Sequence, residues 1–247
     1  MSLLSTITGR RDLPEGTPDP DTLFKDPVNS QIAVALWKGK TKTYLDLIPT
    51  SPNLDEVGKD KITLLEWALF MQRLKGFEAL LDAGADPALE TYPTPPGSDP
   101  LVFDLVDMDD PAYFEAVMER GFNPDFRSNR GATLLGRAAR AGREAQFNAL
   151  MSRGADVNMA DANGSTPLNS AFSANKYHLG LALLEAGADP HAEVGPNHTP
   201  LHRFVNWDED ILTQDALEGR RKVRDWFAKH DIPLPEARIP AWKVKGK

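Results

Sequence analysis

Apolar residues recur along this chain in short runs at a spacing of three to four positions, which is typical of helices that bury one face. Residues 28–48 show the pattern first. One helix is marked by Ile32, Ala33, Leu36 and Trp37, and a second by Tyr44, Leu45 and Ile48. Asp26-Pro27 supplies an N-cap and a proline at the first helical position, and Lys38-Gly39-Lys40 forms a turn. The pattern therefore predicts two short helices joined by a turn.

The same arrangement repeats along the chain with a period near 33 residues. Segments that open a first helix begin at Thr63, Asp99, Thr133, Thr166 and Thr199, at spacings of 36, 34, 33 and 33. Segments that close a second helix begin at Gly84, Gly121, Gly154 and Gly187, at spacings of 37, 33 and 33. A unit of two short helices cannot bury its apolar face alone, so such units stack.

The recurring residue types explain the repeat chemically. A threonine hydroxyl caps a helix, and proline is tolerated in the first turn. Glycine after the second helix supplies a residue in the left-handed conformation. Paired leucines such as Leu183-Leu184 are expected to fill the layer between units.

These motifs resemble the ankyrin repeat. Thr199-Pro200-Leu201-His202 matches its opening segment, and Gly154-Ala155-Asp156-Val157-Asn158 matches its close. The resemblance covers residues 28–235. It implies an all-α solenoid of about six stacked helix-turn-helix units with finger turns and degenerate capping repeats at both ends. Residues 1–27 are then an extended lead-in, and residues 236–247 a C-terminal tail.

Two segments depart from the regular pattern. Residues 87–98 form a longer, proline-rich finger that carries Tyr92. In the last unit, residues 206–215 are an insertion, and the second helix is expected around residues 220–229. The basic run Arg220-Arg221-Lys222-Val223-Arg224 on that helix is read as a solvated terminal cap, and nucleic-acid binding is not expected.

Composition narrows the possible classes of protein. The 247 residues are 41% hydrophobic and 26% charged, as in an ordinary globular domain, and contain no cysteine. Disulfides and thiolate metal sites are therefore excluded. No apolar run approaches the roughly 18 residues of a spanning helix, so membrane insertion is not expected. The apolar run at the N-terminus is shorter than the apolar core of a signal peptide. As written the chain is expected in the cytoplasm, and in the periplasm if a leader was removed.

The net charge of −8 is unevenly distributed. Residues 1–130 contain 13 Lys or Arg and 22 Asp or Glu, whereas the remainder is close to neutral. No basic residue lies between Asp99 and Arg120, and the acidic series in or near this stretch is Asp104, Asp107, Asp109, Asp110, Glu115 and Glu119. Such a series would complement a partner with a basic surface. The alternative is that it serves solubility alone.

The sequence offers no catalytic or metal-binding constellation. His198 and His202 are four residues apart, but Pro200 lies between them, and the resemblance assigns His202 a structural hydrogen bond. Asp107, Asp109 and Asp110 lack the ligand alternation of a calcium loop. Nucleophile elbows, phosphate-binding loops and dinucleotide-binding loops are absent from the sequence. We therefore expect a non-enzymatic protein with no cofactor and no metal.

The resemblance implies that the chain binds another protein through a concave face of inner helices and through the finger loops. The predicted contact residues are Phe70, Met71, Tyr92, Val106, Asp107, Arg127, Asn129, Arg130, Arg140, Asn163, Asn197, Asn206 and Trp207. Phe70, Met71 and Trp207 are the sharpest candidates, because aromatic residues and methionine are enriched in interface cores. The alternative is that Phe70 and Met71 pack on the neighbouring unit and Trp207 under its own insertion.

Residues 18–27 and 64–69 are also similar to bacterial ankyrin-repeat proteins encoded beside secreted toxins. That resemblance implies an immunity protein that neutralises a type VI secretion effector. A general scaffold or chaperone-like adaptor without an enzyme target is the alternative. On its own, the chain is expected to be a monomer.

Overall fold

The computed structural model describes residues 19–90, 99–193, 199–206 and 212–235. The chain divides into two compact units. Unit 1 comprises residues 1–105 and 112–122, and unit 2 comprises residues 106–111 and 123–247. In the described ranges, all regular structure is helical apart from one isolated bridge between Arg127 and Thr133. The predicted all-α class is therefore confirmed.

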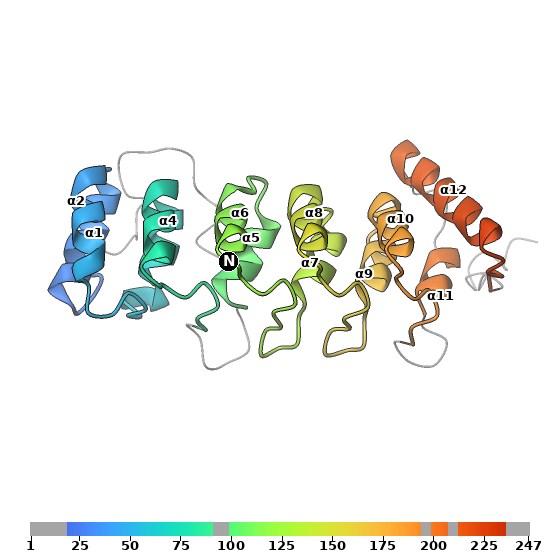
Figure 1. Ribbon diagram of the computed structural model, residues 1–247, viewed down its shortest axis with the longest axis horizontal. Coiled ribbons are helices and arrows are strands. Elements are labelled where there is room, and N and C mark those ends of the chain that lie inside the picture. Colours follow the sequence, from blue (N-terminus) through green and yellow to red (C-terminus); the bar gives the residue numbers. More distant parts are fainter. Residues whose placement is uncertain (1–18, 91–98, 194–198, 207–211, 236–247) are drawn as a thin grey trace, which may run out of the picture. The chain divides into compact units, whose positions relative to one another are not determined.

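Unit 1 is built from antiparallel helix pairs (Figure 1). Its helices are α1 (Pro27–Trp37), α2 (Thr41–Leu47), α3 (Leu64–Phe70), α4 (Leu74–Asp82), the first five residues of α5 (Leu101–Asp107) and α6 (Ala112–Glu119). First helices pack on first helices, as α1 does on α3, and second helices on second helices, as α2 does on α4 and α4 on α6. The described part of unit 1 also contains the short 3-10 helices η2 (Pro20–Thr22), η3 (Ile48–Thr50) and η4 (Lys59–Lys61).

Capping side chains set where the helices of unit 1 begin. The Asp26 carboxylate accepts hydrogen bonds from the backbone N–H groups of Val28 and Asn29, and Pro27 occupies the first turn. Thr63 and Glu66 form a reciprocal capping box at α3. Because these bonds satisfy donors that have no partner within the helix, helices of only seven residues can form where packing also supports them.

The core of unit 1 is centred on Trp67, whose side chain is fully buried. Its indole Nε1 donates a 2.9 Å hydrogen bond to the carbonyl of Ala33 on α1. Leu23 and Phe24, from the predicted lead-in, are also buried. The residues just before α1 therefore pack onto the unit.

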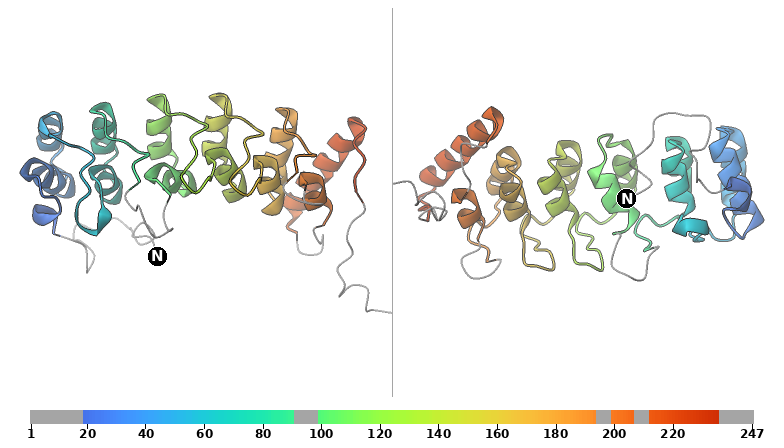
Figure 2. Two further views of the ribbon diagram at one scale, coloured as in Figure 1. Left: turned by 90° about the horizontal axis from the view of Figure 1, so that it is seen from below. Right: turned by 180° about the vertical axis from the view of Figure 1, so that it is seen from behind.

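Unit 2 repeats the same architecture. Its pairs are α7 (Leu134–Ala141) with α8 (Glu144–Ser152), α9 (Pro167–Ser173) with α10 (Tyr177–Glu185), and α11 (Pro200–Val205) with α12 (Gln214–Lys229). Within unit 2, Figure 2 shows the first and second helices as two layers, and α9 contacts both α7 and α11. Thr133, Thr166 and Thr199 cap the first helices as predicted.

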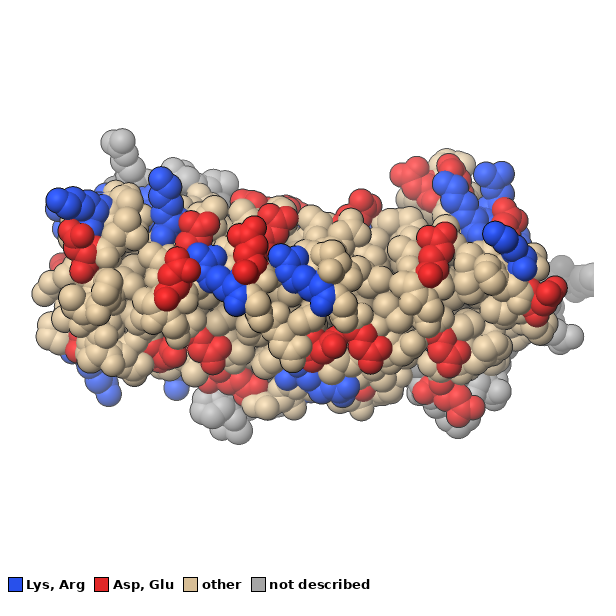
Figure 3. All heavy atoms as spheres, in the orientation of Figure 1, with Lys and Arg blue, Asp and Glu red and all other residues tan. Residues whose placement is uncertain are grey.

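The last helix differs from the sequence-based expectation in two ways. It begins at Gln214, six residues before the predicted start, because Thr213 caps it. Arg220 is 5% exposed and lies over the rings of Tyr177 and Phe204, so it belongs to the core of unit 2. The other side of α12 carries interleaved basic and acidic side chains (Figure 3), including the pair Lys222–Glu218. The solvated cap therefore comprises only part of the basic run.

Candidate functional site

Unit 2 contains a polar groove of about 440 Å³, which we call the α7 groove. It lies between α7, the start of α9 and the hairpin loops that precede them. Its lining residues are Asp107, Ala132, Thr133, Gly136, Arg137, Arg140, Ala141, Asp161, Ser165 and Ser170. The lining combines charged and hydroxyl groups with a floor of glycine and alanine.

The sequence of α7 separates a buried face from the groove face. Leu134, Leu135, Ala138 and Ala139 are buried, whereas Arg137 is half-buried and Arg140 is exposed. Gly136 contributes to the floor, and a Cβ at this position would lie 2.7 Å from the Thr133 hydroxyl. That hydroxyl is the helix cap and accepts a hydrogen bond from the Gly136 N–H. The same kind of threonine cap forms over Asn169 in α9 and over His202 in α11, so the glycine matters for the open floor and not for the cap.

An ion pair holds one of the two arginines of the groove. Arg137 donates from Nε and Nη2 to Oδ2 of Asp107, at 2.9 and 2.6 Å. Both side chains remain partly exposed, at 29% and 44%, so the pair contributes at most about 1 kcal/mol to stability. Its clearer effect is on geometry, because it fixes the Arg137 guanidinium beside the floor. Within the described residues Arg140 has no ion pair and remains available in the groove.

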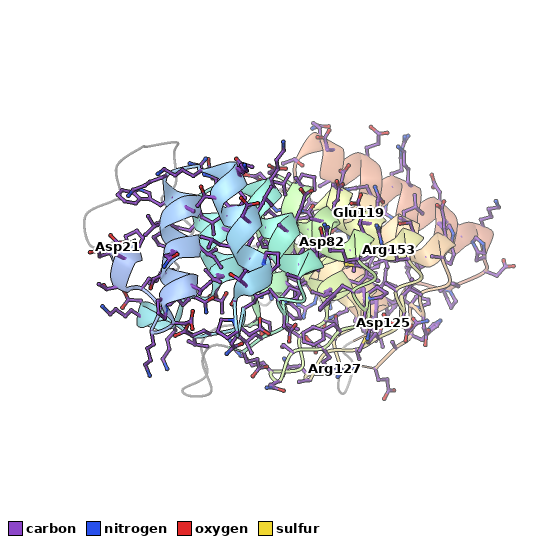
Figure 4. The ribbon with its side chains drawn as sticks, turned by 60° about the vertical axis from the view of Figure 1, so that its left-hand side comes forward. Asp21, Asp82, Glu119, Asp125, Arg127 and Arg153 are labelled. Carbon is purple, nitrogen blue, oxygen red and sulfur yellow. The ribbon has the colours of Figure 1, made fainter. Side chains whose placement is uncertain are left out.

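Hydrogen bonds join the hairpin loops next to the groove to one another. The carboxylate of Asp161 accepts hydrogen bonds from the N–H groups of Asn163 and Ser165, and the Ala162 N–H donates to the carbonyl of Gly131. Arg127 donates from Nη2 to the carbonyl of Ala160 at 2.6 Å. Figure 4 places Asp125 and Arg127 on the loop that precedes α7. The groove therefore has one wall of helices and one of cross-linked loops.

A second set of hydrogen bonds joins successive repeats within each unit, at three of the closing motifs. The Asp86 N–H donates to Asp55, the Asp156 N–H to Asp125 and the Asp189 N–H to Asn158, at 2.8–2.9 Å. Each bond joins residues 31 positions apart. This periodicity was present in the sequence, in the acidic and amide residues that recur at that interval.

Several predicted contact residues lie in or near the α7 groove. Asp107 and Arg140 line it. On the hairpin loops, the exposed predicted residues are Arg127, Asn129, Arg130 and Asn163. Asn206 is exposed at the end of α11, and Met71 is partly buried at the end of α3. Arg137 was not among the predicted residues, although its position three residues before Arg140 places it on the same helix face.

Two predicted contact residues are corrected by their burial. Phe70 is 6% exposed and stacks on Trp67 with ring centroids 5.7 Å apart, and Val106 is fully buried. Both belong to the core, which agrees with the packing alternative for Phe70. Tyr92, Asn197 and Trp207 lie outside the described residues.

The acidic series is also less free than its sequence suggests. Asp107 pairs with Arg137, and Asp109 pairs with Arg143, the residue just before α8. Gln146 of α8 donates a 2.8 Å hydrogen bond to the carbonyl of Met108. The segment 107–109 is thus fastened to unit 2 by side chains some 30 to 38 residues away.

Within the described ranges, the structure contains neither a cluster of metal-ligating side chains nor a helix that could span a membrane. No group of three or more histidine or acidic side chains there is arranged to hold a metal ion. None of the helices in those ranges is both long enough and apolar enough to cross a membrane. His202 lies 2.9 Å through Nδ1 from the Thr199 hydroxyl, and it therefore has the structural hydrogen bond that the resemblance implied.

Comparison with solved structures identifies the fold. The ankyrin repeat domain of Bcl-3 superposes with a TM-score of 0.63 at 20% identity, over 79% of this chain and 85% of that chain. An ankyrin repeat domain from Acinetobacter baumannii gives 0.62 at 19% identity, over 81% and 97%. The chain has the ankyrin-repeat fold. The predicted ankyrin-repeat solenoid is thereby confirmed, and the human ASB11 ankyrin repeat domain adds a third match at 0.55 and 18% identity, over 77% and 82%.

Sequence comparison matches a smaller part of the chain than structure comparison does. No protein-family model matches the chain. Protein PhlB of Serratia liquefaciens is 33% identical over 124 residues, which are 50% of this chain and 52% of that protein. The match thus spans about half the length of this curated relative.

Proposed function

We propose that this ankyrin-repeat protein is a non-enzymatic module that binds another protein, and that the α7 groove and the loops beside it form the contact surface. The observation that carries the proposal is the arrangement of Arg137 and Arg140. One arginine is positioned by Asp107 and the other is exposed, and both line a groove with a floor of small residues. A protruding polar segment of a partner fits such a groove.

The charge of the groove indicates the chemistry of that segment. Arg127, Arg130 and Arg140 are exposed on the loop and helix walls, and Asp107 is already paired. Arginine presents a planar fork that binds carboxylates in two-point contacts. We therefore expect the partner to present carboxylates or backbone carbonyls to this surface. The basic partner surface suggested by the acidic series would have to contact other residues.

A small-molecule site is less well supported by the same geometry. Small-molecule pockets of this size are mostly lined by apolar and aromatic side chains that enclose the ligand. The α7 groove is lined by charged, hydroxyl and very small side chains, and contains no aromatic residue. Its chemistry resembles the polar part of a protein interface.

We further propose that the partner is a secreted toxin that this protein neutralises. Support comes from the resemblance of residues 18–27 and 64–69 to bacterial ankyrin-repeat proteins encoded beside toxins. A monomer that covers an effector surface with its groove fits this role. Co-expression in a host with the product of the adjacent reading frame tests it, because neutralisation predicts that growth is restored.

Binding itself is tested by calorimetry with the purified product of the adjacent reading frame. Arg140→Glu is expected to raise the Kd by about tenfold or more, because it places a like charge opposite the partner's carboxylates. Arg221→Glu on the exposed side of α12 makes the same charge change outside the groove and is the matched control. Equal binding by wild type and Arg140→Glu would contradict the assigned surface. No binding by the wild type would contradict that partner.

A further inference from the structure

Unit 1 contains a hollow of its own, which we call the lysine hollow. It lies where η2 and the segment after it meet the hairpin turn around η4, and its volume is about 690 Å³. Its lining residues are Thr22, Leu23, Phe24, Lys25, Val57, Gly58, Lys59, Asp60 and Lys61. The hollow shares no residue with the α7 groove.

The walls of the lysine hollow are fixed by backbone contacts. The Lys59 N–H donates a 2.8 Å hydrogen bond to the carbonyl of Leu23, and the Gly58 N–H donates one of 2.8 Å to the carbonyl of Ile62. A Cβ on Gly58 would lie 2.7 Å from the Leu23 oxygen, so only glycine permits this approach. The buried side chains of Leu23 and Phe24 anchor the opposite wall.

The turn itself has an unusual backbone. Asp60 and Lys61 have φ values of 55° and 64°, although neither is glycine. Left-handed residues at both central positions are typical of the type I′ turn of a two-residue hairpin. The Ile62 N–H closes this turn with a 3.3 Å hydrogen bond to the carbonyl of Lys59. The turn places Lys59 and Lys61 at the rim of the hollow.

The rim carries three lysines and one acidic residue, Asp60, around an exposed apolar residue. Lys25, Lys59 and Lys61 are exposed, and Val57 is 40% exposed. Lys59 Nζ donates to the neutral hydroxyl of Thr22 at 2.9 Å, so its charge is not compensated there. Among the described residues, none of the three lysines forms an ion pair. Figure 3 shows basic side chains protruding at the edge of unit 1 near η2.

We propose that the lysine hollow binds an acidic segment of a partner protein. Carboxylates of the segment contact Lys25, Lys59 and Lys61, and one apolar side chain of the segment covers Val57. A short protein segment is favoured over a nucleic acid or an anionic membrane, because it contacts only the three lysines of the hollow, whereas an extended polyanion also faces the rest of a chain whose net charge is −8. The proposal does not depend on the α7 groove.

The experiment uses the full-length, ¹⁵N-labelled protein and a synthetic peptide, acetyl-Glu-Glu-Leu-Glu-Glu-amide, with the matching glutamine peptide as a control. We expect the acidic peptide to shift amide resonances of residues 23–25 and 57–62, with the glutamine peptide giving little change. Raising the salt from about 50 mM to about 500 mM is expected to weaken the effect, because the contacts are exposed and screened.

The double variant Lys25→Glu/Lys61→Glu is expected to bind the acidic peptide roughly fivefold more weakly or worse, since each exposed ion pair contributes modestly. It leaves the Lys59–Thr22 bond intact. Lys42→Glu/Lys75→Glu, at exposed lysines of α2 and α4, makes the same charge change and is expected to bind as wild type. Arg140→Glu is also expected to retain binding, which separates this site from the proposed groove.

Three results would overturn the proposal. Equal shifts with the glutamine peptide would remove the role of charge. Equal loss in the Lys42→Glu/Lys75→Glu variant would show an effect of net charge alone. The wild type could also bind vesicles that contain phosphatidylglycerol. If only the Lys25→Glu/Lys61→Glu variant failed to bind them, the hollow would be assigned to a membrane surface instead.

Discussion

Phe70 provides the sharpest test of what is core and what is surface in unit 1. Its sequence position in α3 matches a contact site of ankyrin repeats, but its side chain is 6% exposed and stacks on Trp67. Replacing a buried phenylalanine by alanine costs about 3–5 kcal/mol, from lost burial and from the cavity left behind. Part of that cost is the ring contact, worth about 0.5–1.5 kcal/mol. Phe70→Ala is therefore expected to destabilise unit 1 strongly.

The assay is thermal and urea unfolding followed by circular dichroism. For a chain of this size, about 3–5 kcal/mol corresponds to a fall in Tm of roughly 6–20 °C. Phe70→Leu fills much of the cavity that alanine would leave, and its Tm is expected to fall clearly less than that of Phe70→Ala. Below the unfolding transition, Phe70→Ala should bind a partner as wild type does. A change in Tm of less than about 2 °C together with weakened binding would refute the assignment of Phe70 to the core.

Two further predictions concern a partly buried carboxyl and a close packing contact. Burial raises the pKa of Glu66; the Thr63 hydrogen bonds oppose this rise and the charge of Asp104 adds to it. Because the folded state binds this proton more tightly than the unfolded state, the protein loses folding stability as the pH rises through the folded-state pKa. Glu66→Gln keeps the cap but does not titrate. Its free energy of unfolding, measured in urea relative to that of the wild type, should therefore increase between about pH 4 and pH 7. A difference that stays constant over this range would contradict the prediction. Gly180→Ala would place a Cβ 2.4 Å from Cε1 of Phe172. This overpacking should lower the folding stability by about 1–3 kcal/mol, which outweighs the gain of about 1 kcal/mol from the higher helix propensity of alanine. A higher Tm for Gly180→Ala would show that the contact relaxes at no cost.

The repeating elements of this fold were predictable because their signals are local. Thr166 caps α9 through its own hydroxyl, and Gly187 adopts a φ of 91° at a place where an added Cβ would have no neighbour within 4 Å. Both roles need only residues nearby in sequence. The same holds for the turn at Gly39, whose φ is 64°.

The remaining features depend on contacts distant in sequence. Arg137 meets Asp107 across 30 positions, and neither residue type specifies that pairing. The burial of Phe70 and Val106 has a different cause. A seven-residue first helix packs against other helices on more than one side, so its apolar residues do not form a single stripe that sequence periodicity can separate from a binding face. Arg220 was misassigned for a related reason, since its position in a basic run gives no sign of the aromatic rings beneath it.

The central claim is that the α7 groove holds a protein partner, and hydrogen–deuterium exchange of the full chain tests it most directly. Exchange is measured with and without the product of the adjacent reading frame, at concentrations at which the two form a complex. The account predicts slower exchange on binding in residues 127–141 and 161–170. A complex that leaves the exchange of both segments unchanged would contradict it.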